Sequence, residues 1–303
     1  MTSAGMESLY TAIEETSGLL NITPVRDKVW PILSAYDLEK VVVAFRVTTR
    51  GSEDLDCRFT ALPADVNPYR YAVSKGIAEE TDHPVGTLLD DVQANIPVTA
   101  HGVDFGVVGG FKKTWTFLPA NDLQKLSKVA ALPSMAPSLG ENLDFYARYG
   151  LDDKNSMIGI DYPSRTVNVY FLQFPDACRE PETVRAMLRD LGLGEPSERM
   201  LALARQAVGI YTTLTWDSPK IQRITFATMV PDARALSERI ADLDPTVEKF
   251  AKNVPYTYPG PVQGLYNVAS YSGGEYFKLQ TYHQLAEGSL EARVLLGNAG
   301  SGH

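Results

Sequence analysis

The sequence predicts an α+β fold, a ten-stranded antiparallel β-barrel built from five αββα units, with helices outside and a solvent-filled lumen. Three observations lead to this prediction. Strand-like segments come in five pairs, helix-like segments separate the pairs, and the pairs recur roughly every 50 to 60 residues, as repeated supersecondary units do. A barrel of ten strands is wider than the eight-stranded kind that side chains fill, so it leaves room for a ligand.

Each strand pair is recognised by alternating residues on both sides of a short turn-like connection. Gly109-Gly110 and Ser272-Gly273-Gly274 are two such connections. The predicted pairs are, in order, Val41–Thr48 with Glu53–Leu62, Val103–Val108 with Phe111–Leu118, Ser156–Tyr162 with Arg165–Gln173, Ala207–Trp216 with Ile221–Met229, and Gly264–Tyr271 with Glu275–His283.

The helix-like segments carry apolar residues at helical spacing. In Met6–Leu20, for example, Leu9 and Ile13 lie among glutamate and threonine residues. Such one-sided helices need an apolar surface to cover, and the outer wall of a barrel supplies one. The remaining predicted helices are Val85–Ala94, Leu139–Tyr149, Pro181–Leu193, Ser197–Ala207 and Pro231–Leu243.

Composition excludes several classes of protein. No apolar run approaches the roughly 18 residues of a membrane helix, and no signal-peptide pattern is present. A net charge of −9 disfavours nucleic acid and anionic membranes as partners. We expect one domain over residues 1–303 with a flexible tail at 297–303, because no linker or low-complexity segment divides the chain, and we expect a monomer. The two cysteines have no redox or metal spacing, which favours the cytoplasm. No nucleophilic triad is recognisable around the cysteines and histidines, which are Cys57, Cys178, His83, His101, His283 and His303.

Charged residues share strand faces with small or polar ones. Arg46 lies on the same strand face as Ala44, and Asp56 lies on the same face as Arg58. One interpretation places these faces in water, as in half-solvated antiparallel sheets. The intervening helices favour the other, in which the polar faces line the lumen. Unpaired buried charge is costly, so a basic lumen calls for an anionic ligand, and its aromatic residues suit an apolar body.

Several short segments, taken in order, carry a resemblance to a known family. The chain resembles the soluble bacterial aromatic prenyltransferases, the ABBA or prenyltransferase-barrel family, and is most similar to members that prenylate naphthalene or naphthoquinone compounds. The segments are Val25-Arg26-Asp27-Lys28, Asp54-Leu55-Asp56, Gly109-Gly110-Phe111-Lys112-Lys113-Thr114, Leu132-Pro133-Ser134-Met135, Ala147-Arg148-Tyr149-Gly150-Leu151-Asp152, Val167-Asn168-Val169-Tyr170-Phe171, Lys220-Ile221-Gln222-Arg223 and Glu275-Tyr276-Phe277-Lys278-Leu279.

The resemblance implies an active site in the lumen and a Friedel-Crafts-type reaction of secondary metabolism. An allylic diphosphate, with geranyl diphosphate as the expected co-substrate, ionises; a small phenolic or naphthalene-type ring attacks the cation; a ring proton is lost. Two alternatives remain: a non-catalytic barrel that binds an anionic apolar ligand, and a phosphatase-like hydrolase, although neither a nucleophile nor a two-metal site is apparent.

By the same resemblance, Lys113, Arg223, Lys278 and Tyr211 are the expected catalytic residues, because fixed cations stabilise a departing diphosphate. Lys112, of opposite parity to Lys113, is expected to be solvated. The full diphosphate-binding set adds Arg46, Arg58, Thr166 and Asn168, and the wall around the prenyl chain and the aromatic acceptor is formed by Trp115, Met157, Tyr170, Val208, Gln280 and Tyr282.

Asp56 matches the aspartate that holds Mg²⁺ in metal-dependent members of the family. Here Arg58 and Arg46 stand where those members carry small residues. We therefore expect that no cofactor is required, that the two guanidinium groups replace the metal, and that Asp56 is their ion-pair partner. Val208, Gly209, Gln280 and Ser164 differ from the most similar family member, so the acceptor and its site of prenylation stay open.

Overall fold

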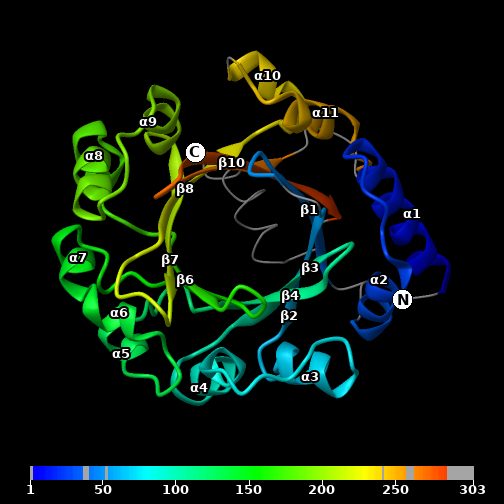
Figure 1. Cartoon of the computed structure of the whole chain (residues 1–303), viewed down its shortest axis with the longest axis horizontal. Coiled ribbons are helices and arrows are strands. Elements are labelled where there is room, and N and C mark those ends of the chain that lie inside the picture. The colour runs from blue at the N-terminus through cyan, green and yellow to red at the C-terminus, as the bar shows by residue number, and fades with distance from the viewer. Residues whose placement is uncertain (1–2, 37–40, 52–53, 241, 257–262, 285–303) are drawn as a thin grey trace, which may run out of the picture.

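The barrel predicted from the sequence is confirmed. The computed structural model describes residues 3–36, 41–51, 54–240, 242–256 and 263–284. Its ten strands close into one antiparallel barrel in the order β1-β10-β9-β8-β7-β6-β5-β4-β3-β2 (Figure 1). The strands are β1 (Val42–Thr48), β2 (Asp56–Pro63), β3 (Ala100–Gly106), β4 (Gly110–Phe117), β5 (Met157–Asp161), β6 (Thr166–Phe171), β7 (Ala207–Thr215), β8 (Arg223–Val230), β9 (Gly264–Tyr271) and β10 (Gly274–Gln284).

Helices lie around the outside of this barrel (Figure 1). They are α1 (Ser3–Leu19), α2 (Arg26–Ala35), α3 (Pro68–Ser74), α4 (Leu88–Asn95), α5 (Leu126–Ala130), α6 (Pro137–Glu141), α7 (Leu143–Arg148), α8 (Pro181–Asp190), α9 (Glu198–Ala204), α10 (Leu236–Arg239) and α11 (Pro245–Asn253), with 3-10 turns η1 (Pro84–Gly86), η2 (Asp176–Arg179) and η3 (Ala233–Ala235). Among the described residues, no helix is both long and apolar enough to cross a membrane. The expected tail at 297–303 lies outside the described residues.

Four helices were missed in the sequence: the five-residue α5, and α2, α3 and α11, in which proline dominates the signal. Helix α2 contains Pro31 in its interior, a position that disfavours helix. Helices α3 and α11 begin at Pro68 and Pro245, where the missing N–H costs nothing. Asn67 and Asp244 cap these two starts by accepting hydrogen bonds from backbone N–H groups of the first turn.

The single helix predicted at Pro231–Leu243 was wrong. The segment forms η3 and then α10, which ends at Arg239. Ile240 then adopts an extended conformation, which ends the helix, and Asp242 follows with a left-handed φ of 55°. Similarly, the predicted helix at Leu139–Tyr149 is divided at Asn142 into α6 and α7.

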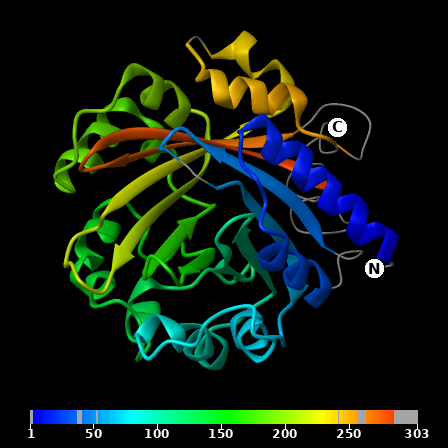
Figure 2. The same cartoon turned by 45° about the vertical axis from the view of Figure 1, so that its right-hand side comes forward.

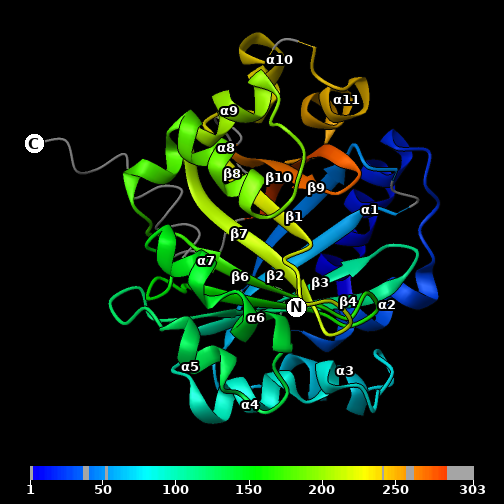
Figure 3. The ribbon, with the colours of Figure 1, turned by 60° about the vertical axis from the view of Figure 1, so that its left-hand side comes forward.

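The outer face of the barrel is the main hydrophobic core. The rings of Phe45, Phe59 and Phe105 are fully buried there beneath the helices. Helices α1 and α11 lie beside the β1–β10 side of the barrel (Figure 2), and α6 to α9 lie along β6 to β8 (Figure 3). Because apolar side chains point outward to the helices, the alternate side chains of each strand point into the lumen.

The direction of these side chains decides whether the polar strand faces lie in water or line the lumen. Arg46, Ala44 and Arg58 face the lumen, and register pairs Arg46 with Asp56 and Ala44 with Arg58. Across the next strand pair, Arg58 stands opposite Asp104. The polar strand faces therefore meet inside the barrel rather than in bulk water.

Candidate active site

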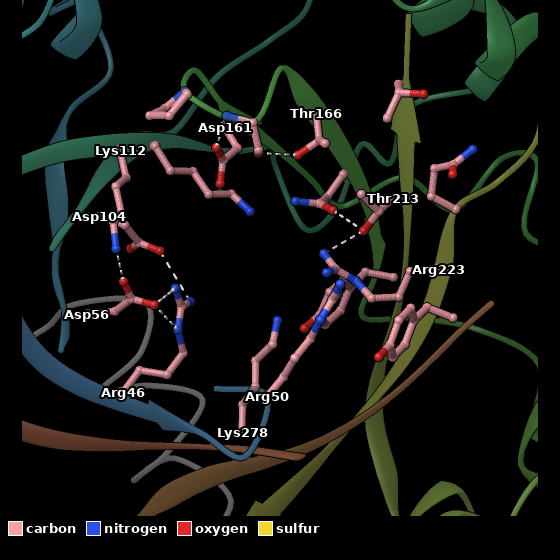
Figure 4. A pocket seen from close by; sticks show the side chains of 18 of the residues that line it. Arg46, Arg50, Asp56, Asp104, Lys112, Asp161, Thr166, Thr213, Arg223 and Lys278 are labelled. Carbon is pink, nitrogen blue, oxygen red and sulfur yellow. Dashed lines mark hydrogen bonds and ion pairs between the residues drawn. The ribbon is translucent and has the colours of Figure 1, made fainter. Parts of the chain in front are cut away.

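The lumen holds a chamber of about 670 Å³ that opens at one end of the barrel. Arg46, Asp56, Asp104 and Lys112 gather on one side of it, and Arg223 and Thr213 face them across the space (Figure 4). Lys278 points into the gap between these two groups (Figure 4). The chamber thus has two walls of different charge balance.

The first wall, contributed by β1 to β4, is a closed network of ion pairs. Arg46 donates to Asp56 at 2.7 Å and contacts Asp104 at 3.2 Å, and Arg58 binds Asp104 through two bonds of 2.7 and 3.1 Å. Burial works to raise the pKa values of Asp56 and Asp104, but the neighbouring cations hold both pKa values below their usual range. Each cation of this wall already has a carboxylate partner.

Lys112 belongs to this wall, so the expectation of a solvated residue was wrong. A β-bulge pairs Asp104 with Lys113 but Phe105 with Phe111, which leaves Lys112 as the extra residue. The bulge turns its amine inward, where it lies 2.8 Å from both Asp54 and Asp56. Gly106 leaves the necessary space, since a Cβ there would lie 1.8 Å from an Asp54 oxygen.

The second wall carries a cation with no carboxylate partner among the described residues. Arg223 donates from Nη1 to the hydroxyl of Tyr276 and from Nη2 to Thr213 at 2.8 Å. Thr213 donates in turn to the Asn168 side chain. The Nε atom of Arg223 is buried without a hydrogen-bond partner in the part of the chain that the structure describes. The network holds the guanidinium in place and leaves its charge uncompensated.

Lys113 is the second such cation. Its amine lies 3.9 Å from the centre of the Trp115 ring and 3.5 Å from the Tyr170 hydroxyl. Gly159 makes this position possible, because a Cβ there would lie 2.7 Å from the Lys113 side chain. Burial lowers the pKa of Lys113 to about 7, against the opposing effect of nearby Asp161 and Asp104.

Lys278 is the third basic residue without a carboxylate partner among the described residues. It stands on β10 opposite Thr48 of β1, and the aromatic contact that it makes is with Tyr276, at 5.1 Å. Burial comes first among the causes that hold its pKa well below the usual value, followed by the charges of Arg223, Arg46 and Lys113. These three basic residues, Lys113, Arg223 and Lys278, form what we call the unpaired cluster.

An apolar recess of about 90 Å³ continues the chamber inward. Tyr170 stacks on Tyr211 with ring centres 4.5 Å apart, and Trp115 lies 5.1 Å from Tyr170. The Arg58 guanidinium covers the Trp115 ring at 3.9 Å. Small or apolar residues complete the lining, namely Met157, Leu172, Gly209, Ala227 and Leu265, with the amides of Asn267 and Gln280.

Most of the residues predicted from the sequence line one or both spaces. Chamber and recess share Arg46, Trp115, Tyr170, Tyr211 and Lys278; Asp56, Lys113, Thr166, Asn168 and Arg223 line the chamber, and Arg58, Met157 and Gln280 line the recess.

Two predicted wall residues lie outside both linings. Val208 is the extra residue of a bulge in β7, with 38% of its surface exposed. Tyr282 packs with Val42, Ala44 and Met229. Its hydroxyl accepts a hydrogen bond from Gln280 and so helps to position this recess residue.

Other lining residues were missed. Asp104 is the clearest: it binds both Arg46 and Arg58, whereas Asp56 alone was predicted as the ion-pair partner of these two arginines. Asp104 shares one face of β3 with Gly102 and Gly106, and this alternation could have placed it in the lumen. Arg50 and Thr213 were missed too. The Arg50 guanidinium lies over Tyr271 at 4.2 Å beside the opening.

The first wall does not fit a divalent metal. Mg²⁺ requires free carboxylate oxygens together with phosphate and water. Both oxygens of Asp56 are bound, one to Arg46 and the other to Lys112. No group of three or more histidine, cysteine, aspartate or glutamate residues suited to a metal occurs within the described ranges.

Taken together, the geometry suits a ligand with an anionic head and an apolar tail. The unpaired cluster offers positive charge to the head, with the Tyr211 hydroxyl and the Asn168 amide nearby as donors. The aromatic rings then enclose the tail and shield it from water.

Comparison with known proteins agrees with this reading. The model of the aromatic prenyltransferase Orf2 family matches residues 4–293. The chain is 45% identical over 286 residues to flaviolin linalyltransferase of Streptomyces virginiae, covering 93% of each chain. It is also 45% identical to 5,10-dihydrophenazine-1-carboxylate 9-dimethylallyltransferase of Streptomyces anulatus, over 93% of this chain and 94% of that protein.

A further relative is the furaquinocin biosynthesis prenyltransferase of Streptomyces sp. (strain KO-3988), 46% identical over 91% of this chain and 90% of that protein. Among solved structures, 5-dimethylallyl tryptophan synthase from Streptomyces coelicolor, in complex with DMASPP and Trp, aligns with a TM-score of 0.51. Identity to that chain is 11%, with 90% of this chain and 92% of that chain covered, so the likeness concerns the fold.

Proposed function

Because this chain belongs to the aromatic prenyltransferase Orf2 family and is an aromatic prenyltransferase of secondary metabolism, we propose that it transfers a geranyl group to a small phenolic or naphthalene-type ring in the barrel lumen. The observation that carries the proposal is the unpaired cluster standing over an aromatic recess. The relatives named above act on flaviolin and on a dihydrophenazine, which are fused-ring compounds of the size that we propose.

We assign binding of the diphosphate to the basic residues of the chamber. Lys113, Arg223 and Lys278 bind the diphosphate, assisted by Arg46, Tyr211, Thr166 and Asn168. As the carbon–oxygen bond breaks, charge grows on the diphosphate, so fixed cations stabilise the transition state more than the ground state.

The aromatic recess protects the cation that remains. Tyr170, Tyr211 and Trp115 present electron-rich rings, each able to contribute about 0.5–2 kcal/mol to a nearby cation. Arg58 and Lys113 already cover Trp115. We therefore assign the allylic cation to the stacked Tyr170–Tyr211 pair, and to Trp115 the role of fixing the two bases.

The test is a product assay. Geranyl and dimethylallyl diphosphate are each incubated with a panel of dihydroxynaphthalenes, flaviolin and simple phenols, and the products are identified by mass spectrometry and NMR. The proposal expects carbon–carbon coupled products, with geranyl transfer to a fused-ring phenol the fastest. Hydrolysis of the diphosphates with every acceptor left unchanged would contradict it.

The reaction should not require a divalent metal. The observation that supports this is the double ion pairing of Asp56, with Arg46 and Lys112 in the place of a metal. We expect turnover to persist after exhaustive EDTA treatment. As a control, Arg46→Ser frees one oxygen of the Asp56 carboxylate, while Lys112 still binds the other, and should make turnover partly dependent on added Mg²⁺. Abolition of wild-type turnover by EDTA with full recovery on Mg²⁺ would show that Asp56 is a metal ligand.

Arg50 should govern capture of the diphosphate rather than the chemical step. It is exposed at the opening and is held over Tyr271 and Tyr276. A cation there raises the local concentration of an anionic substrate. Arg50→Ala should therefore raise the KM for prenyl diphosphate several-fold and weaken its salt dependence, with little change in kcat, measured between low and physiological ionic strength. A fall in kcat at unchanged KM would place Arg50 in the chemistry instead.

We further propose that the enzyme acts as a monomer in the cytoplasm. Cys57 and Cys178 are buried and unbridged, as expected in a reducing compartment. Sedimentation analysis of the purified protein tests the first part.

A further inference from the structure

The reaction must move a proton from the aromatic ring, and the structure offers one group suited to carry it. Five residues line both the chamber and the recess: Arg46, Trp115, Tyr170, Tyr211 and Lys278. We look for a group that serves both the diphosphate and the aromatic ring among these five; Lys113, the other lumen amine with a lowered pKa, lines the chamber alone.

Four of them cannot exchange a proton near neutral pH. The guanidinium of Arg46 stays charged, and the indole of Trp115 does not titrate. Burial raises the pKa values of Tyr170 and Tyr211, so both hydroxyls stay protonated. The amine of Lys278 remains, because its surroundings favour the neutral form.

Those surroundings are crowded with positive charge. No carboxylate is ion-paired with Lys278 among the described residues, whereas Arg46, Arg58 and Lys112 each have one. Asp56 acts in the opposite direction, but it is held by two other cations. The charged or titratable groups around Lys278 are Arg46 on β1, Asp56 on β2, Lys113 on β4, Tyr211 on β7, Arg223 on β8 and Tyr276 on β10 itself.

We propose that Lys278 is the proton carrier of the reaction, a catalytic acid and then base whose amine is neutral in the empty chamber and gains one proton from solvent when a prenyl diphosphate binds. The proposal rests on the proposed function, since it needs the diphosphate beside the unpaired cluster. A trianionic head reverses the local field, and an ammonium then becomes the favoured form.

The steps balance. The bond between the prenyl carbon and the diphosphate oxygen breaks, and its electron pair stays on oxygen. Lys278 gives a proton to the departing diphosphate and becomes a neutral amine. The ring carbon bonds to the prenyl cation, and the amine accepts the ring proton as the carbon–hydrogen pair restores aromaticity. The products are the prenylated ring and hydrogen diphosphate, and Lys278 ends the step protonated, as it began.

The decisive variant is Lys278→Arg, which keeps a positive charge but cannot give up its proton. Its thermal unfolding should remain cooperative, with a lower midpoint than the wild type, because the guanidinium adds a permanent charge to an already positive chamber. We expect a geranyl thiolodiphosphate, which resists ionisation, to bind both proteins with similar affinity. Turnover of geranyl diphosphate should fall by about 10²–10⁴ in Lys278→Arg, the usual contribution of general acid–base catalysis.

Proton uptake is measured separately, by calorimetry of thiolodiphosphate binding at pH 8 in two buffers of different ionisation enthalpy. At this pH the terminal phosphate is already fully ionised, because the second pKa of a phosphate group is about 6. The wild type should take up close to one more proton than Lys278→Arg. Lys220→Arg, an exposed position outside the chamber, should behave as the wild type in every measurement.

Chemical rescue separates a proton carrier from a fixed charge. Lys278→Ala should regain turnover with methylamine and not with guanidine. Turnover of Lys278→Arg close to that of the wild type, equal proton uptake by the two proteins, or equal rescue by methylamine and guanidine would each overturn the proposal. If the wild type binds the thiolodiphosphate and forms product, such a result leaves the proposed function intact; if it does neither, both fail.

Discussion

Replacing Arg223 with alanine should lower kcat by about 10²–10³, because removing one preorganised donor to a developing anion costs about 2.7–4 kcal/mol. Arg223 is suited to this effect, since Tyr276 and Thr213 hold two of its nitrogens while no carboxylate of the described residues neutralises it. The measurement is single-turnover conversion of geranyl diphosphate at saturating acceptor, so that substrate binding does not enter the rate.

Two variants control this experiment. Arg223→Lys keeps the charge but loses the planar fork that matches phosphate oxygens, so its rate should fall between the wild type and the alanine variant. Arg205→Ala removes a charge from an exposed position after α9 and should leave the rate unchanged. Near-normal single turnover by Arg223→Ala would remove Arg223 from the assigned role.

The second large effect concerns stability. Asp104 has 2% of its side chain exposed and neutralises both Arg46 and Arg58. Asp104→Asn keeps the shape but leaves these two cations without their shared carboxylate, and breaking a buried ion pair in this way costs about 3–5 kcal/mol. Urea unfolding should show a loss of this size. Asp153→Asn, which removes an exposed partner of Lys154, should cost about 0–1 kcal/mol.

The same residue predicts a pH dependence. Burial acts to raise the pKa of Asp104, but Arg58 and Arg46 outweigh it and depress the pKa on folding. The contribution of Asp104 is therefore present above the unfolded carboxyl pKa of about 3.9 and is lost as pH falls below that value. The wild type should lose stability between about pH 4 and pH 2 more steeply than Asp104→Asn. Parallel curves for the two proteins would contradict the role given to Asp104.

Much of the barrel could be predicted because alternation and turn residues act locally. The strand pairs follow from period-two patterns beside glycine-rich turns, and the inward direction of Arg46 and Lys113 follows from parity alone. Parity failed at Lys112, where a bulge inserts one extra residue into β4. A bulge depends on how two strands pair, and the β4 segment by itself does not reveal it.

Which basic residues of the chamber are paired with carboxylates could not be predicted from the sequence. Asp104 meets Arg46 and Arg58 only because β3 lies beside β2 and β2 beside β1. Five basic residues of the site were recognised from the sequence, but their division into paired and unpaired groups depends on this strand order. That division is what distinguishes the wall that is already neutral from the cations still available to a diphosphate.

The most direct test of the central claim is a crystal structure with bound geranyl thiolodiphosphate, grown with Mg²⁺ present. The account predicts that the diphosphate oxygens contact Lys113, Arg223 and Lys278, with Arg46 still bound to Asp56. The geranyl chain should lie against the stacked rings of Tyr170 and Tyr211. A Mg²⁺ ion joining Asp56 to the diphosphate, with Arg46 displaced and the unpaired cluster out of contact, would contradict it.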